Sequence, residues 1–178
     1  MKKLIILLKI ILIISGTIIF AQNKVPRLSP KSFVGQTVGS TILKITYGSP
    51  GVKGRKIWGE LVPYNIVWRT GANEATTIEF DSDVIIDGKK IPTGKYSLFT
   101  IPNKDTWTII LNKTYDQWGA YNYNEKEDFI RFKAQPIVNH HVERLSYKIE
   151  YLDSYKSKIY MEWEKLAVSF EIKTDLKN

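Results

Sequence analysis

Apolar and polar residues alternate with a period of two along several short stretches of the chain, as in β-strands that are buried on one face. Residues 145–151 show the pattern most clearly, because every second residue is apolar and Ser146, Lys148 and Glu150 lie between them. Residues 158–164 and 167–173 repeat the pattern. The alternation therefore predicts one half-buried strand in each of these three stretches.

Turn signals and fully apolar runs complete the prediction of a β-rich fold. Asp87-Gly88 separates two short runs, residues 84–86 and 89–91, and supplies the positive φ values that a tight hairpin turn needs. Residues 95–101 and 106–111 are apolar on both faces, which is typical of central strands. Further strands are predicted over residues 41–47, 76–80 and 129–133. A total of about nine strands, at the spacing of sandwiches and barrels, predicts an all-β fold, an antiparallel and jelly-roll-like β-sandwich.

The first 21 residues differ from the rest and have the layout of a secretory signal peptide. Lys2 and Lys3 form a positive start, an apolar stretch runs to Phe20, and Ala21 is a small residue suited to cleavage. Lys9 argues against the alternative, an uncleaved membrane anchor, because a lysine costs about 3 kcal/mol at the centre of a membrane helix. We expect an exported protein, periplasmic or secreted, with no membrane span after cleavage.

The domain boundaries follow from this leader and from the prolines behind it. Pro26 and Pro30 fix their own φ and restrict the residue before them, which predicts an extended linker over residues 22–32. A single sandwich domain is expected over residues 33–174, followed by a C-terminal tail, residues 175–178.

Composition excludes several classes of function. The chain has no cysteine and therefore no disulfide, thiol nucleophile or cysteine-ligated metal. Its formal net charge of +8 falls to +5 when the leader, with three lysines and no acidic residue, is removed. The remaining charges are mixed in sign, so we expect no nucleic-acid binding. We also expect no metal and no other cofactor: His140 and His141 are assigned to a solvated turn, and adjacent residues of a strand could not share one metal.

Residues 48–74 form a long stretch without alternation or helical period, and connections of this length are typically binding loops. Trp68 offers a flat ring and Arg69 a fork of donors. Asn73 and Glu74 add further donors and acceptors. This combination predicts a binding site for a polar ligand such as a saccharide.

Two further interpretations of the same stretch stay open. Lys53 and Arg55 are candidate anion-binding residues. In a purely structural alternative, Arg69 and Glu74 form a buried ion pair that holds the end of the sandwich together, and Trp58 and Trp68 belong to the core.

A second stretch, residues 115–125, interleaves aromatic residues with amides and acids. Trp118 and Tyr121 could cover the apolar face of a sugar, while the neighbouring amides and acids take its hydroxyl groups. The alternative is a loop that packs over its own domain.

The sequence gives no reason to assign catalytic residues. It lacks the Gly-x-Ser-x-Gly pattern of a nucleophile elbow. The remaining enzymatic option is a pair of carboxylates, Glu74 with Asp116 or Glu60, in the manner of a glycosidase, and nothing in their spacing supports it.

A set of motifs is spread over nearly the whole chain after the leader, and the run Trp68-Arg69-Thr70-Gly71-Ala72-Asn73-Glu74 is the most specific of them. The other segments are Ser29-Pro30, Gln36 to Gly39, Ile45 with Tyr47, residues 50–55, 61–64, 67–76, 94–102 and 116–121, Trp163-Glu164 and residues 168–170. Together these motifs resemble one family of exported bacterial proteins, domain of unknown function 2911.

The resemblance implies an envelope or secreted protein and supplies no catalytic residue. From the aromatic, amide and charged composition of the two irregular stretches we expect a non-catalytic binding module for a polar or saccharide ligand of the cell envelope. Two alternatives remain: a structural envelope protein that binds a protein partner and has no small-molecule site, and a carboxylate-based hydrolase.

Overall fold

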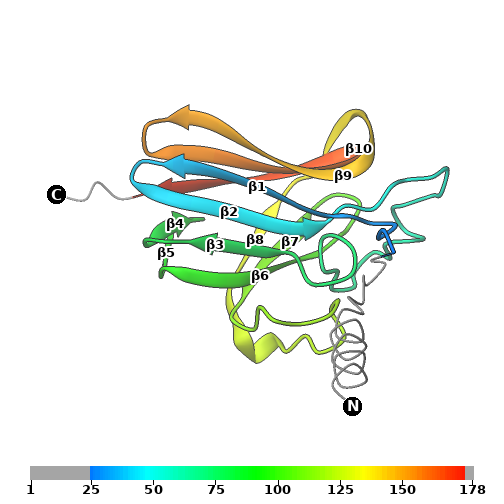
Figure 1. Cartoon of the computed structure of the whole chain (residues 1–178), viewed down its shortest axis with the longest axis horizontal. Helices are drawn as coiled ribbons and strands as arrows, with labels where there is room; N and C mark the ends of the chain where they lie inside the picture. Colours follow the sequence, from blue (N-terminus) through cyan, green and yellow to red (C-terminus); the bar gives the residue numbers. More distant parts are fainter. Residues whose placement is uncertain (1–24, 175–178) are drawn as a thin grey trace, which may run out of the picture.

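A computed structural model describes residues 25–174, which form a sandwich of two antiparallel β-sheets (Figure 1). The larger sheet has the strand order β1-β2-β3-β6-β7-β8 and the smaller one the order β5-β4-β10-β9. The prediction of an all-β antiparallel sandwich is confirmed, with ten strands. The predicted signal peptide, residues 1–21, and the C-terminal tail, residues 175–178, lie outside the described residues.

The strands of the larger sheet are β1 (Lys31–Val38), β2 (Thr41–Gly48), β3 (Thr77–Phe80), β6 (Gly94–Ile101), β7 (Trp107–Asn112) and β8 (Asp128–Ala134). The smaller sheet contains β4 (Val84–Ile86), β5 (Lys89–Ile91), β9 (Ile137–Asp153) and β10 (Lys156–Thr174). One short 3-10 turn, η1 (Glu125–Glu127), precedes β8. Within residues 25–174 no helix has the length and apolar character needed to span a membrane.

The smaller sheet contains longer strands than the alternation predicted. Residues 158–164 and 167–173 belong to one strand, β10, so the prediction of two separate strands there was wrong. A bulge explains the difference: Glu164 has a φ of 55°, and the register with β9 shifts on both sides of it. Such a bulge bends a strand without ending it. The predicted hairpin of residues 84–91 is confirmed, with positive φ at both Asp87 and Gly88.

β1 is an edge strand that the pattern did not reveal, because its residues are only partly buried and Gly35 interrupts them. It begins at Lys31, before the expected domain start at Phe33, and pairs with β2 along its whole length. The expected linker is also attached to the domain, since the carbonyl oxygen of Pro30 accepts a hydrogen bond from Ser49 N at 2.9 Å.

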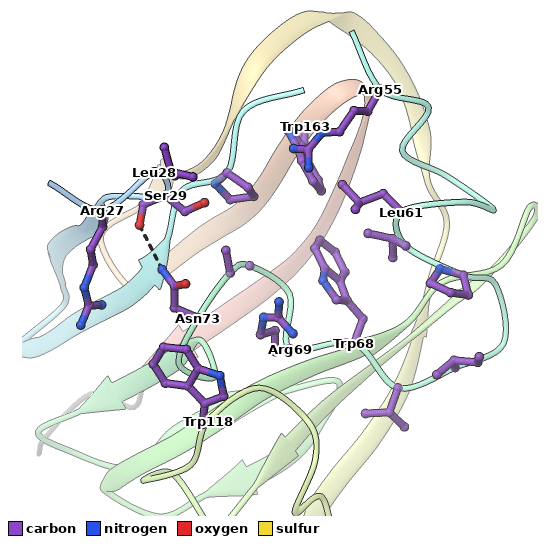
Figure 2. A pocket seen from close by; sticks show the side chains of 17 residues that line it. Arg27, Leu28, Ser29, Arg55, Leu61, Trp68, Arg69, Asn73, Trp118 and Trp163 are labelled. Atoms are coloured by element: carbon purple, nitrogen blue, oxygen red, sulfur yellow. Dashed lines mark hydrogen bonds between the residues drawn. The ribbon is translucent and has the colours of Figure 1, made fainter. Parts of the chain in front are cut away.

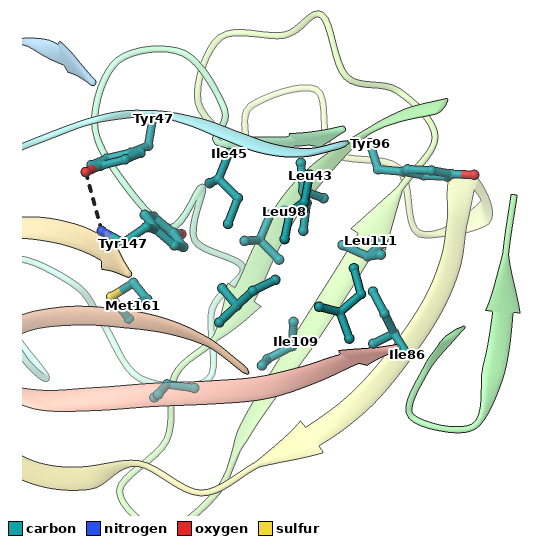
Figure 3. Packing of buried hydrophobic residues seen from close by; sticks show 14 of the residues in the cluster. Leu43, Ile45, Tyr47, Ile86, Tyr96, Leu98, Ile109, Leu111, Tyr147 and Met161 are labelled. Atoms are coloured by element: carbon teal, nitrogen blue, oxygen red, sulfur yellow. Dashed lines mark hydrogen bonds between the residues drawn. The ribbon is translucent and has the colours of Figure 1, made fainter. Parts of the chain in front are cut away.

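The core lies between the two sheets, where buried side chains from both meet (Figure 3). On β2, every second residue from Thr41 to Tyr47 is buried, as its alternation requires. Leu98 and Ile109 of the larger sheet face Met161 of the smaller one across this core. The period-two pattern therefore identified the inner face of β10 and of Leu145 and Tyr147 on β9, whereas Tyr151, which it placed on the same face, is 65% exposed.

Four indole rings form a tryptophan cluster at one end of this core. Trp107 comes from β7, Trp163 from β10, and Trp58 and Trp68 from the irregular segment between β2 and β3. Ring centroids lie 5.0 to 6.4 Å apart, and four of the five contacts are edge-on. Edge-on packing sets the positive edge of one ring against the negative face of another. The indole nitrogens of Trp58, Trp107 and Trp163 are buried and have no hydrogen-bond partner among the described residues.

The cluster predicts that two tryptophans at the same end of the molecule contribute very differently to the free energy of unfolding. Trp163 is 1% exposed, and Trp163→Ala should lower the free energy of unfolding by about 3–5 kcal/mol. Trp118 is 55% exposed, and Trp118→Ala should change it by no more than about 0.5 kcal/mol. Urea unfolding of both variants measures the difference. Equal losses would contradict the role given to the cluster.

Candidate functional site

The segment between β2 and β3, residues 49–76, has no strand of its own, as predicted, but it is attached to both sheets. Toward β9, Val52 N donates to Glu143 O at 2.7 Å, and Leu145 N donates to Pro50 O at 3.0 Å. Toward β6, Trp68 and Thr100 exchange two backbone hydrogen bonds of 2.7 and 2.9 Å. The segment therefore closes one end of the sandwich, at the right in Figure 1.

A tight corner at residues 70–73 fixes the direction of the polar side chains in this segment. It crosses the end of β2 so closely that a Cβ on Gly48 would lie 2.0 Å from Ala72 O. Thr70 is buried and has a φ of 53°, an unusual conformation for a β-branched residue. Such strain persists only where surrounding contacts hold it.

Hydrogen bonds from both sheets hold this corner. The carbonyl oxygen of Thr70 accepts from Thr76 Oγ1 at 2.9 Å and from the Tyr147 hydroxyl at 3.0 Å. Burial raises the pKa of Tyr147, so its hydroxyl remains a donor. Thr70 Oγ1 also bonds Thr100 Oγ1 at 3.2 Å. The backbone is therefore held in place both at Arg69, directly before the corner, and at Asn73, its last residue.

The turn that carries Trp118 is docked against this corner. Gly119 N donates to Asn73 O at 3.0 Å, and Ala75 N donates to Gln117 O at 3.0 Å. Gly119 has a φ of 64°, and a Cβ there would lie 3.4 Å from Arg69 Nη1. These contacts bring together the two stretches that the sequence singled out separately.

Between these elements lies a cleft of about 680 Å³, which is within the usual size range of small-molecule sites (Figure 2). One wall is apolar and includes Leu61, Pro63 and Ile66. The polar and aromatic part consists of Arg27, Ser29, Arg55, Trp68, Arg69, Asn73, Trp118 and Trp163. Of the described residues that line it, none is acidic.

Arg69 and Glu74 do not form the buried ion pair of the structural alternative. Glu74 is bound instead by Arg27, whose Nη1 lies 2.7 and 2.8 Å from the two carboxylate oxygens. The reason is the corner, which has positive φ at Thr70 and Asn73 and separates the two side chains. Among residues 25–174, the buried Nε of Arg69 has no hydrogen-bond partner.

The Arg27–Glu74 pair lies at the surface, with side chains 49% and 38% exposed. Partial burial acts to raise the pKa of Glu74, but the backbone N–H of Glu74, the Arg27 guanidinium and the charge of Lys31 together hold it below its usual value. Glu74 does not line the cleft. It lies in a separate hollow of about 330 Å³ with Asp116, Lys31 and Lys95.

Of the other predicted site residues, some line the cleft and some do not. Asn73 lines the cleft and donates from Nδ2 to Ser29 O at 3.1 Å. Arg55 lines it too, while its guanidinium binds the carbonyl oxygens of Gly51 and Val52. Lys53 and Tyr121 are not part of the lining: Lys53 is exposed, and Tyr121 is 82% exposed.

The carboxylate and histidine candidates of the sequence lie outside the lining of the cleft. A general acid needs a raised pKa, whereas that of Glu74 is lowered. Within the described part of the chain, no group of three or more potential metal ligands is present. His140 and His141 are exposed residues of β9, so their assignment to a turn was wrong. The strand continues through them because β10 pairs with both ends of this stretch.

Sequence reasoning missed several residues of the cleft. Arg27, Leu28 and Ser29 were assigned to the linker, and Trp163 to a strand of the core. Only the resemblance offered a signal for Ser29 and Trp163, because both belong to its motifs. Nothing local marks Arg27 as a partner of Glu74, since 47 residues separate them in the chain.

Comparison with known proteins agrees with the motif evidence. A family model described as "Protein of unknown function (DUF2911)" matches residues 29–172, most of the chain. No solved structure matches the chain. The segments that carry the resemblance converge on the cleft: of its lining residues, only Arg27, Leu28 and Ile66 lie outside them.

The close approach at β2 makes a stability prediction. In Gly48→Ala, the new methyl group would collide with the Ala72 carbonyl, so the corner must shift. The free energy of unfolding should therefore fall by about 1–3 kcal/mol. Gly88→Ala is a control at a glycine with open space around its Cβ, although its positive φ carries a cost of its own. Thermal unfolding measures both. A Gly48→Ala protein as stable as the wild type would show that the corner moves freely.

The exposed ion pair makes a prediction about pH. Glu74→Gln should cost no more than about 1 kcal/mol at neutral pH, because both partners are accessible to water. Since the pKa of Glu74 is lowered on folding, the contribution of its charge is present above the usual value of 4.5 and is lost as the pH falls through the folded pKa. Unfolding curves of wild type and variant should therefore converge in acid. A difference that persists in acid would contradict the pairing.

Proposed function

We propose that this chain, which belongs to the DUF2911 family of proteins of unknown function, is an exported, non-catalytic binding protein of the cell envelope. Its ligand is a saccharide or a similar polar molecule held in the cleft. The observation that carries the proposal is the composition of that cleft, in which an apolar wall and indole rings stand beside arginine and asparagine side chains.

The two kinds of lining match the two kinds of surface on a sugar. Trp118, at the rim, offers a flat exposed ring on which the apolar face of a sugar can stack. Arg69 and Asn73 offer hydrogen-bonding groups for ring substituents. Protein sites that orient a small ligand typically combine an apolar surface with a few fixed polar groups in this way.

Binding suits these side chains better than catalysis. Arginine stays protonated at physiological pH and indole N–H only donates, so neither exchanges a proton with a substrate. Glu74 is the carboxylate next to Asn73 in sequence, and Asp116 is the one next to the turn that carries Trp118. Both lie in the separate hollow, beside Lys31 and Lys95. Export rests on the leader composition of residues 1–21, which lie outside the described residues.

A thermal-shift screen of the purified protein against neutral and acidic oligosaccharides tests this proposal. A ligand that binds only the folded state at about 100 times its dissociation constant adds about 2.7 kcal/mol of stability, which raises the Tm by several degrees. Trp118→Ala should abolish the shift while leaving the unliganded Tm nearly unchanged.

The matched control is Tyr151→Ala, which removes an exposed aromatic ring from β9 and does not alter the lining of the cleft. It should keep the full ligand-induced shift. If no saccharide shifts the Tm, or if both variants lose the shift equally, the binding proposal fails and a structural or partner-binding role is favoured.

A further inference from the structure

We infer that the ligand of this cleft is an acidic saccharide, whose oxyanion binds the guanidinium of Arg69. The inference rests on the proposed function and names its chemical class. Carboxylate, sulfate and phosphate groups share the required chemistry, since each presents paired oxygen acceptors to the donor fork of an arginine.

The first argument is the hydrogen bonding of Arg69. Its Nε is buried and has no acceptor among the described residues. A guanidinium carries five donors and no acceptor and stays charged, so only an acceptor-rich partner can satisfy it. The buried Nε is itself closed to a ligand, so an oxyanion in the cleft would pair with the remaining N–H groups of the fork, which form no ion pair with a described residue.

The second argument is the position of Arg69. Figure 2 shows its guanidinium between the rings of Trp68 and Trp118, both of which line the cleft. The backbone of Gly119 lies close against the same guanidinium. The charged group is therefore bordered by apolar surface, where an ionic hydrogen bond is less weakened by water than at an open surface.

The third argument is the sign of the charges around the cleft. Its charged lining residues are Arg27, Arg55 and Arg69, with no acid among those that the structure describes. Glu74 neutralises Arg27 at the surface and leaves Arg69 without a carboxylate partner in residues 25–174. The neighbouring hollow differs, because Lys31 and Lys95 share it with Glu74 and Asp116. An anion is thus favoured in the cleft and not beside it.

The saccharide part of the inference comes from the apolar wall. Leu61, Pro63 and Ile66 offer surface that a small inorganic anion cannot use. A sugar ring can cover this wall or the Trp118 ring while its charged substituent reaches Arg69. A sugar ring that bears an oxyanion can therefore contact both the apolar wall and Arg69.

The test compares trigalacturonate with its methyl ester, which keeps the sugar rings and removes the charges. Binding to the full purified protein is followed by calorimetry and by the fluorescence of the tryptophans that line the cleft. We expect the acid to bind about 10- to 100-fold more tightly than the ester, the range expected for losing a charge-assisted hydrogen bond. Added salt should weaken binding of the acid.

Variants locate the charge contact. Arg69→Ala should lose the preference for the acid, and Arg69→Lys, which keeps the charge without the planar fork, should retain part of it. Lys104→Ala removes one positive charge from an exposed turn outside the cleft and should bind like the wild type. Because the acid and ester are compared on the wild-type protein, the result does not depend on Arg69→Ala folding.

The outcomes separate the inference from the proposed function. If acid and ester bind equally tightly, or if Arg69→Ala keeps the preference, the acidic assignment is wrong while saccharide binding stands. If inorganic phosphate binds as tightly as trigalacturonate, the saccharide half of the inference is wrong. If no neutral or acidic saccharide binds, both the inference and the proposed function fail.

Discussion

The packing of four tryptophans is the interaction on which the rest of this structure depends. Trp107 belongs to one sheet and Trp163 to the other, while Trp58 and Trp68 come from the segment that closes the sandwich. That segment has no ladder of hydrogen bonds to hold it, so its position is set by buried aromatic area and a few backbone contacts. The cluster thereby ties the two sheets together and positions Trp68 and Trp163, which line the cleft.

Next to this cluster, the corner at residues 70–73 sets the direction of the polar side chains that line the cleft. Its backbone is strained, and the surrounding hydroxyl groups of Thr76, Thr100 and Tyr147 hold it in place. A backbone that is already held removes the cost of ordering a loop on binding, which favours affinity. Arg69 directly precedes this corner, and its buried Nε has no hydrogen-bond partner among the described residues.

Charge is distributed so that the acids stay outside the cleft. Glu74 is one residue from Asn73, yet it points to Arg27 at the surface. The consequence is a small region of positive sign in a protein whose charges are otherwise mixed. Neither the net charge nor the order of residues reveals this arrangement, since it depends on which way each side chain leaves the corner.

The sequence by itself determined the fold class, most strands and the two stretches that form the cleft. Alternation is a local property, so it identified the buried face of β10, and Asp87-Gly88 identified its hairpin for the same reason. Only the tertiary structure decided which polar groups meet. The partner of Glu74, the contribution of Arg27 and Ser29, and the exclusion of Lys53 and Tyr121 from the cleft all depend on contacts between distant segments. Such contacts follow from how the chain packs, which no local pattern encodes.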